Sequence, residues 1–300
     1  MNNNYAQKVE LLLRMMPIIS DEGVFAVHGG TAINLFLKDL SRYSVDVDLT
    51  YILLEDRQTS ISNINTHLKA ISERAQKSLK GIHIVPNPAT CKLLCEYRGK
   101  QIKIEVNQTK RGIIGGNVLR LPLCSKAQEE FGLYCEADIV PKTLLYGGKM
   151  AAALSRQHPR DLFDIKYMDM PILEAKEGFL FCLLGSDRPI HESLGPVLID
   201  QREALHNQFE GMTDIPFTYE EYEETRNKLI KSVNGLLNDN DKRFLIGFEM
   251  ANPDWEHFEY SYFEKYPSVQ WKLINLLKLK NTNPEKLMNE AEKLRELFIQ

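Results

Sequence analysis

The stretch that decides the fold is His28–Leu49, HGGTAINLFLKDLSRYSVDVDL, in which a glycine pair is followed by two closely spaced aspartates. The apolar run VFAVH that leads into Gly29 and Gly30 has the character of a short buried strand, which the glycines end. Thr31–Leu40 carries apolar residues at helical spacing, so a helix is expected directly after the glycines. Val45–Leu53 alternates at first and then becomes wholly apolar, which predicts a second strand. Strand, turn, helix and strand in this order indicate an α/β arrangement.

The alternation of helices and strands continues through the first half of the chain. Arg57–Leu79 has the periodicity of a long amphipathic helix, and Pro141 stands where proline favours the first turn of another. The tripeptide Arg98-Gly99-Lys100 fits a tight turn between two strands. The further strands that we expect lie at residues 81–86, 91–98, 101–108 and 137–140. A loop is expected between residues 109 and 122, where three glycines occur.

Length and composition agree with two globular domains. The chain has 300 residues, of which 43% are hydrophobic and 26% charged, and these values exclude a disordered, fibrous or coiled-coil protein. From about residue 170 the pattern is mostly helical and is broken by turns that contain proline and glycine. We therefore predict an α/β (α+β) domain with a mixed sheet over residues 1–170, followed by an α-helical bundle over residues 171–300.

Membrane and secretory classes do not fit this sequence. No apolar run approaches the ~20 residues that a bilayer-spanning helix needs. The first residues lack the basic segment and uninterrupted apolar core of a secretory signal. The five cysteines are an odd number scattered along the chain, which favours reduced thiols over a disulfide framework. We expect a cytoplasmic protein without membrane contact.

The two aspartates after the glycine turn are the first candidate functional residues. In a strand, side chains two positions apart point to the same face, so Asp46 and Asp48 should project together, while Val45, Val47 and Leu49 enter the core. Two adjacent carboxylates repel each other unless a cation lies between them. Mg²⁺, or Mn²⁺ in its place, prefers such oxygen ligands.

The glycine turn is the second candidate. Gly29 and Gly30 allow the backbone to approach a ligand closely, and the N-terminus of the following helix favours a phosphate. Thr31 adds a hydroxyl donor, and Ser44 either contacts phosphate or caps the turn before the strand. A phosphate cradle beside a metal-binding carboxylate pair is suited to in-line phosphoryl or nucleotidyl transfer.

These motifs resemble the signature of the DNA polymerase β-type nucleotidyltransferase superfamily, Gly-Gly-Thr/Ser followed by Asp-x-Asp. The longer form here, which includes Arg42-Tyr-Ser44-Val-Asp46-Val-Asp48, is similar to the AbiEii-type toxins of bacterial toxin–antitoxin and abortive-infection systems. The resemblance covers roughly residues 20–170. It implies a minimal nucleotidyltransferase core as the fold of the α/β domain, with Asp46 and Asp48 as metal ligands.

A second block, KMAAALSRQHPRDLFD, supports the same resemblance. It begins at Lys149, which stands at the family's position for a nucleotide-phosphate contact, and Asp161 stands at an acidic family position. Lys142, Lys149 and Arg156 are seven apart and so share one helix stripe, which suits a triphosphate or an RNA backbone. Asp161 would orient Lys149 or Arg160, or assist the attacking group.

Asp164 and Glu105 are additional candidates with competing interpretations. Asp164 either belongs to the site or pairs with Arg160 or Lys166 on its own helix. The family often adds a third carboxylate from a neighbouring strand, and Glu105 is the candidate for it here. Glu105 would complete the metal site or act as a base toward the acceptor hydroxyl, but an ordinary solvated strand residue is the competing interpretation.

The resemblance implies a Mg²⁺-dependent enzyme that moves NMP from an NTP onto an acceptor, with RNA, especially the tRNA 3′ end, as that acceptor. It also implies a growth-inhibiting toxin with an antitoxin protein as partner. Transfer to a protein hydroxyl or a small molecule, and a non-catalytic NTP-binding module, are the alternatives. The stretch Lys92–Arg111 holds six basic residues against two acidic ones, and it is either a solvated hairpin or an RNA contact.

Overall fold

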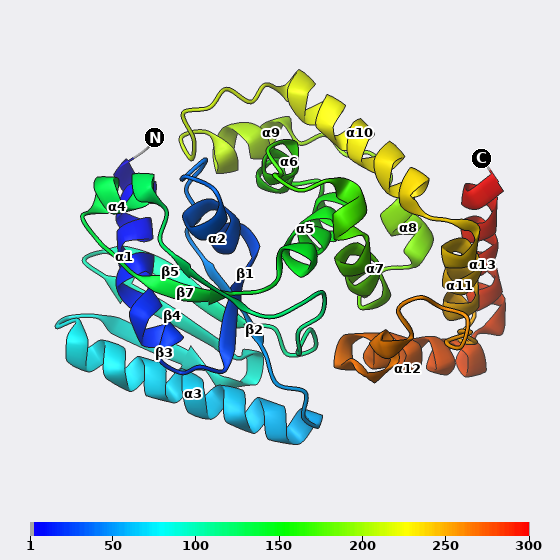
Figure 1. Ribbon diagram of the computed structural model, residues 1–300, viewed down its shortest axis with the longest axis horizontal. Coiled ribbons are helices and arrows are strands. Elements are labelled where there is room, and N and C mark those ends of the chain that lie inside the picture. Colours follow the sequence, from blue (N-terminus) through cyan, green and yellow to red (C-terminus); the bar gives the residue numbers. More distant parts are fainter. Residues whose placement is uncertain (1–2, 300) are drawn as a thin grey trace. The chain divides into compact units, whose positions relative to one another are not determined.

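The computed structural model describes residues 3–299, which form two compact units (Figure 1). The first, here the sheet unit, comprises Met1–Pro141 and Phe209–Pro216, and the second, the helical unit, comprises Lys142–Gln208 and Phe217–Gln300. A mixed sheet with helices in one unit and helices alone in the other confirms the predicted α/β (α+β) class. No helix within residues 3–299 combines the length and the apolar character needed to cross a membrane.

The boundary between the compact units differs from the sequence-based division at residue 170. It lies between Pro141 and Lys142, because the two helices that follow pack with later helices of the chain rather than with the sheet. The short segment Phe209–Pro216 returns to the sheet unit, where the backbone N–H of Tyr43 donates to the carbonyl oxygen of Met212. The division of function between residues 1–170 and 171–300 stays a prediction.

Within residues 3–299 the sheet has seven strands in the order β3-β4-β5-β2-β1-β7-β6. The pairs β2–β5 and β1–β7 are parallel and the other four are antiparallel, so the sheet is mixed. The strands are β1 (Phe25–His28), β2 (Val47–Tyr51), β3 (His83–Asn87), β4 (Lys92–Tyr97), β5 (Lys100–Val106), β6 (Leu119–Pro122) and β7 (Glu136–Ile139).

Helices cover the sheet where its strands carry apolar residues. Helix α1 packs against β1, β5 and β7, and α3 packs against β3, β4 and α1 (Figure 1). In β5 the alternation is complete, since Ile102, Ile104 and Val106 are buried and the residues between them are not. The helical elements of the sheet unit are α1 (Asn3–Ser20), α2 (Gly29–Ala32), the π-helix η1 (Ile33–Leu37), α3 (Arg57–Ser78), the 3₁₀ turn η2 (Pro88–Thr90) and α4 (Ser125–Phe131).

The structure confirms some local predictions and corrects others. The turn between β4 and β5 is formed by Arg98 and Gly99, both with positive φ, as a two-residue hairpin requires. The helix expected over Thr31–Leu40 is shorter, because a π-helical turn follows α2 and ends at Leu37. The loop expected up to residue 122 instead contains β6, which is short and pairs only with β7.

The helical unit contains no strand within the described residues. Two of its helices begin with side chains that accept hydrogen bonds from the first turn, namely Thr218 before α10 and Asn238 before α11. Its helical elements are α5 (Lys142–Arg156), α6 (Pro159–Lys166), η3 (Ile172–Ala175), α7 (Lys176–Leu184), α8 (Ile190–Leu194), α9 (Arg202–Ala204), η4 (Leu205–Phe209), α10 (Tyr219–Leu236), α11 (Asp239–Glu249), η5 (Ser261–Lys265), α12 (Pro267–Thr282) and α13 (Pro284–Ile299).

Helices α5 and α7 touch backbone to backbone. A Cβ atom on Gly147 would lie 2.2 Å from the backbone of Gly178 and Phe179, and one on Gly178 would lie 2.0 Å from the carbonyl oxygen of Thr143. Only glycine therefore fits at either position of this crossing. This contact fixes the position of α5 against α7. Helix α5 also carries Lys149, two residues after Gly147.

Replacing Gly147 with alanine is expected to lower the free energy of unfolding by about 3 kcal/mol, the upper part of the range for an overpacked core. The added methyl group meets backbone atoms, which cannot move aside as a flexible side chain can. Gly235 in α10 has open space around it, so Gly235→Ala is the matched control and should stabilise the protein slightly. Urea unfolding of both variants measures the difference, and equal stability of the two would contradict the backbone contact.

Candidate active site

The antiparallel pairing of β1 and β2 brings the glycine turn against Asp48. His28 lies opposite Asp48 in the register, so Gly29, the next residue, turns beside that carboxylate. Gly29 has φ +68°, and a Cβ atom there would lie 2.8 Å from Asp48 Oδ2. Asp48 is solvent-exposed whereas its neighbours Val47 and Leu49 are buried, as strand alternation predicts.

Asp46 and the residues before it are held by a small hydrogen-bond network. The hydroxyl of Thr31 lies 2.5 Å from the carbonyl oxygen of Asp46 and 3.0 Å from the hydroxyl of Ser44. Thr31 has one proton to give, so it donates to the carbonyl and can accept from Ser44. Asp46 precedes the first residue of β2, and its Oδ1 accepts the backbone N–H of Lys103 at 3.4 Å. Both hydroxyls are buried, and their contact with phosphate stays a prediction.

Arg42 is a cation buried beneath the second glycine. A Cβ atom on Gly30 would lie 2.6 Å from Nη2 of Arg42 and 3.0 Å from Oγ of Ser44, so Arg42 occupies the space that a side chain would take. The Arg42 side chain is only 3% exposed and donates from Nη1 to the carbonyl oxygen of Tyr43 at 2.9 Å. The turn that should cradle phosphate thus has positive charge directly behind it.

Glu105 lies opposite Asp48 in the parallel pairing of β2 with β5, so the two side chains share one face of the sheet. Lys92 and Lys103 bind Glu105 at 3.0 and 2.9 Å. Partial burial raises the pKa of Glu105, but the hydrogen bonds and charges of these lysines outweigh it and hold that pKa below its ordinary value. A carboxylate with a depressed pKa stays ionised at neutral pH, which suits a cation ligand better than a general base.

The donor set fits a hard divalent cation. The hydrogen bond to Glu105 raises the pKa of Lys103 against the effect of burial, and the charges of Asp46 and Asp48 add to it. The donors near Lys103 are carboxylate oxygens, which Mg²⁺ and Mn²⁺ require. Within residues 3–299 no three ligating side chains lie close enough together to form a metal site. Glu105 is paired with Lys92 and Lys103.

Replacing Gly29 with alanine is expected to lower nucleotide transfer about a hundredfold, because the new methyl group would displace the Asp48 carboxylate. The backbone strain of alanine at positive φ lowers stability by about 1–2 kcal/mol at any such site. Gly23 has almost the same φ, +67°, and open space around it, so Gly23→Ala carries the strain without touching Asp48. Thermal unfolding should show a similar loss of stability for Gly29→Ala and Gly23→Ala. The rate of nucleotide transfer should fall only for Gly29→Ala. Equal rates would contradict the role of the Gly29–Asp48 contact.

The second sequence block forms a buried ion-pair cluster inside the helical unit. Lys149 Nζ lies 2.9 Å from Asp161 Oδ1 and 3.0 Å from Asp164 Oδ2, and all three side chains are at most 6% exposed. The other oxygen of Asp161 accepts from Arg156 at 2.8 and 3.1 Å. Helix α6, which carries both aspartates, begins where Pro159 follows the His158 cap.

The cluster shows which pairs these residues form. Asp161 binds Lys149 and Arg156, and its roles in orienting Lys149 or Arg160 or in assisting the attacking group stay predictions. Asp164 pairs with Lys149, while Lys166 pairs instead with Glu221. Lys149 is thus compensated by two buried carboxylates rather than being a free positive charge. The contact of Lys149 or Arg156 with a triphosphate and a site role for Arg160 stay predictions.

Sequence reasoning missed three residues that shape the site. Arg42 was visible in the quoted motif, but nothing in its spacing shows that it fills the space behind Gly30. Lys92 and Lys103 lie in a strand pattern that predicts solvated residues, and their pairing with Glu105 depends on the register of three strands. The alternation of β5, with Lys103 and Glu105 on one face, was the available signal.

Comparisons with known proteins agree with this fold. The model of the family described as "Nucleotidyl transferase AbiEii toxin, Type IV TA system" matches residues 10–275. Among solved structures, the chain resembles MenT4, a nucleotidyltransferase toxin from Mycobacterium tuberculosis, with a TM-score of 0.60 and 12% identity. The similarity covers 92% of this chain and 95% of that one, and at this identity it concerns the fold. No curated protein sequence matches the chain.

Proposed function

Because the chain belongs to the AbiEii family of nucleotidyltransferase toxins, we propose that it transfers NMP from an NTP to RNA in a Mg²⁺-dependent reaction. The observation that carries the proposal is the contact between the glycine turn and Asp48. The turn that would bind phosphate lies so close to the carboxylate that would bind metal that a Cβ atom at position 29 would be 2.8 Å from Asp48 Oδ2. Glycine at position 29 is what allows this approach.

The reaction follows from what the residues can hold. The glycine turn, with Arg42 behind it, would bind the triphosphate, and Thr31 and Ser44 would fix the turn or contact a phosphate oxygen. Asp46 and Asp48, with Glu105 beside them, would bind the divalent ion, which supplies charge neutralisation on the phosphates when bound. An acceptor hydroxyl oxygen would form a bond to the α-phosphorus while the bond to the pyrophosphate oxygen breaks; pyrophosphate leaves, and the hydroxyl proton passes to solvent water.

The buried cluster in the helical unit has a separate role in the proposal. Lys149 would bind the triphosphate, and Asp161 and Asp164 would hold its ammonium group in place. The hydrogen bonds of Asp161 and Asp164 to Lys149 support their assignment as positioning residues. Arg156, whose side chain is 63% exposed, would extend the positive surface toward an RNA backbone.

RNA as the acceptor, and the tRNA 3′ end in particular, is supported by the basic residues of the sheet unit and by the toxin family. A nucleotidyltransferase toxin of a toxin–antitoxin system is expected to act in the cytoplasm and to be neutralised by an antitoxin. Mn²⁺ should replace Mg²⁺, since both ions take the same oxygen ligands.

Incubation with each NTP radiolabelled at the α-phosphate, with Mg²⁺ and total tRNA, tests the proposal. RNase-sensitive label is the expected result, and EDTA should abolish it. Label found in protein, or in an added small molecule, would show that the acceptor belongs to that class and is not RNA. Binding of NTP without any transfer would contradict the enzymatic proposal altogether.

A further inference from the structure

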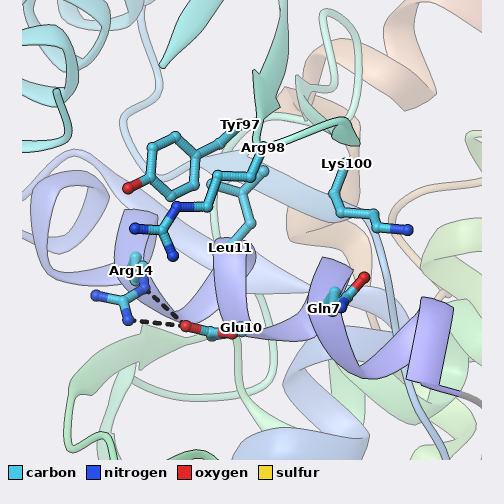
Figure 2. A pocket seen from close by; sticks show the side chains of 7 residues that line it. All are labelled: Gln7, Glu10, Leu11, Arg14, Tyr97, Arg98 and Lys100. Carbon is cyan, nitrogen blue, oxygen red and sulfur yellow. Dashed lines mark hydrogen bonds and ion pairs between the residues drawn. The ribbon is translucent and has the colours of Figure 1, made fainter. Parts of the chain in front are cut away.

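A pocket opens at the tip of the β4–β5 hairpin, on the side that α1 covers (Figure 2). Its volume is about 130 Å³. The lining residues are Gln7, Glu10, Leu11 and Arg14 from α1 and Tyr97, Arg98 and Lys100 from the hairpin. Leu11 is buried and provides an apolar floor, while three cations stand around it.

The charge of the pocket is positive. Its one acidic residue, Glu10, is bound by Arg14 at 2.7 and 3.1 Å, so that pair is neutral. Arg98 lies over the ring of Tyr97, with 5.0 Å from its guanidinium carbon to the ring centroid, and Lys100 donates to Asn4 at 2.8 Å. Within residues 3–299 neither Arg98 nor Lys100 forms an ion pair with a carboxylate. Two uncompensated positive charges therefore line one hollow.

The pocket also resolves the basic stretch Lys92–Arg111. Arg111 is buried and donates to the carbonyl oxygens of Glu55 and Asp56, and Lys92 and Lys103 neutralise Glu105. These cations have structural or site partners inside the unit. Among the described residues, Arg98 and Lys100 contact only the neutral side chains of Tyr97 and Asn4, so both charges remain available to an anionic ligand.

The turn itself does not require an arginine at position 98. Arg98 has φ +50°, in the left-handed region where asparagine or glycine is favoured at the first position of a two-residue hairpin. An Asn-Gly turn would satisfy the hairpin better than Arg-Gly does. Strained non-glycine residues of this kind concentrate at functional sites.

We propose that this pocket binds the phosphate backbone of the acceptor RNA, with one base stacked on Tyr97. Cations that neutralise phosphates beside an aromatic ring are the usual equipment for single-stranded nucleic acid. The proposal rests on RNA being the acceptor and adds a second point of attachment for it. Lys100 is five residues from Glu105 along β5, about 17 Å, and the odd spacing puts the two side chains on opposite faces. The pocket is thus an anchoring site apart from the catalytic face.

The test uses Arg98→Asn/Lys100→Gln, which removes both charges and leaves a favourable Asn-Gly turn, so the hairpin should fold at least as well. Lys77→Gln/Lys80→Gln removes two exposed charges of the same unit and is the matched control. The probe is a fluorescein-labelled single-stranded RNA of about 12 nucleotides, within the usual footprint of such sites. We expect the pocket variant to bind it about tenfold more weakly and the slope of log affinity against log salt to shrink by about 1.4. The control should bind like the unaltered protein.

Two further measurements distinguish the role of the pocket from the proposed transfer reaction. An acceptor of about two nucleotides is too short to extend from the catalytic face to the pocket on the opposite face of the sheet. Its KM should therefore be unchanged in the pocket variant, while that of the long acceptor rises. Tyr97→Leu should weaken RNA binding, and Tyr97→Phe should retain it.

Four outcomes support or overturn the pocket proposal and the proposed function. Equal binding by pocket variant and control, with transfer to RNA intact, overturns the pocket and leaves the proposed function standing. Pocket-dependent binding without transfer supports the pocket and overturns RNA as the acceptor. Uridine 5′-monophosphate binding the pocket as tightly as the long RNA overturns RNA as its ligand. No binding of RNA by the unaltered protein overturns both proposals.

Discussion

Replacing Asp48 with asparagine is expected to lower nucleotide transfer about a thousandfold or more while the protein stays folded. Asparagine has nearly the shape of aspartate but lacks its charge, and charge stabilisation by a bound divalent ion is worth several kcal/mol in such reactions. Asp48 is exposed, and β2 is held by its buried neighbours Val47 and Leu49, so the fold does not depend on this carboxylate. Transfer of α-labelled NTP, together with titration of Mn²⁺ binding, measures both consequences.

The control for this prediction is Asp21→Asn, the same chemical change at a largely exposed carboxylate that lies 3.7 Å from Arg74. A surface ion pair of this kind contributes little, so stability and transfer should both stay near those of the unaltered protein. Full transfer by Asp48→Asn, or unchanged Mn²⁺ binding, would remove the metal assignment of Asp48.

The second large effect is expected at Lys149, where one substitution changes both stability and transfer. Lys149→Met leaves Asp161 and Asp164 buried without their shared cation, and breaking a buried pair on one side lowers stability by about 3–5 kcal/mol. Transfer should fall as well, if Lys149 binds the triphosphate as proposed. The loss of activity alone would not separate these causes, because an unfolded enzyme is also inactive.

A triple variant separates the two causes. Lys149→Met/Asp161→Asn/Asp164→Asn removes the whole buried charge group except Arg156, whose side chain is 63% exposed. Its stability should recover most of what the single variant loses, because no unpaired charge stays buried. Its transfer should stay low. A stable triple variant with full transfer would show that Lys149 has no part in catalysis.

The sequence predicted those features that depend on local pattern. Alternation identified β2 and β5 and the burial of Val47 and Leu49, and the Arg98-Gly99 pair marked the hairpin turn. A bare glycine pair indicates only a turn, and its interpretation as a site depended on the Asp-x-Asp motif and the block at residues 149–164 that follow it. Alternation could not explain why position 29 in particular must be glycine, because the closeness of Gly29 to Asp48 follows from strand register.

Features that depend on the burial of charged groups were not visible in the sequence. The spacing of Lys142, Lys149 and Arg156 predicted one basic stripe facing a ligand. In the structure Lys149 lies in the core beside two aspartates, Lys142 lies 3.4 Å from Asp169, and Arg156 binds Asp161. Helical periodicity shows which residues share a face, but the partner of that face is decided by tertiary packing. The close crossing of α5 and α7 at Gly147 has the same origin.

The most direct test of the account is the location of the bound divalent ion. Fe²⁺ in place of Mg²⁺, with ascorbate and peroxide, generates radicals that cut the backbone next to the ion. The account predicts cuts near Gly29, between Asp46 and Asp48 and near Glu105, all of them suppressed by excess Mg²⁺ and lost in Asp48→Asn. Cuts confined to other segments, or an unchanged pattern in Asp48→Asn, would contradict it.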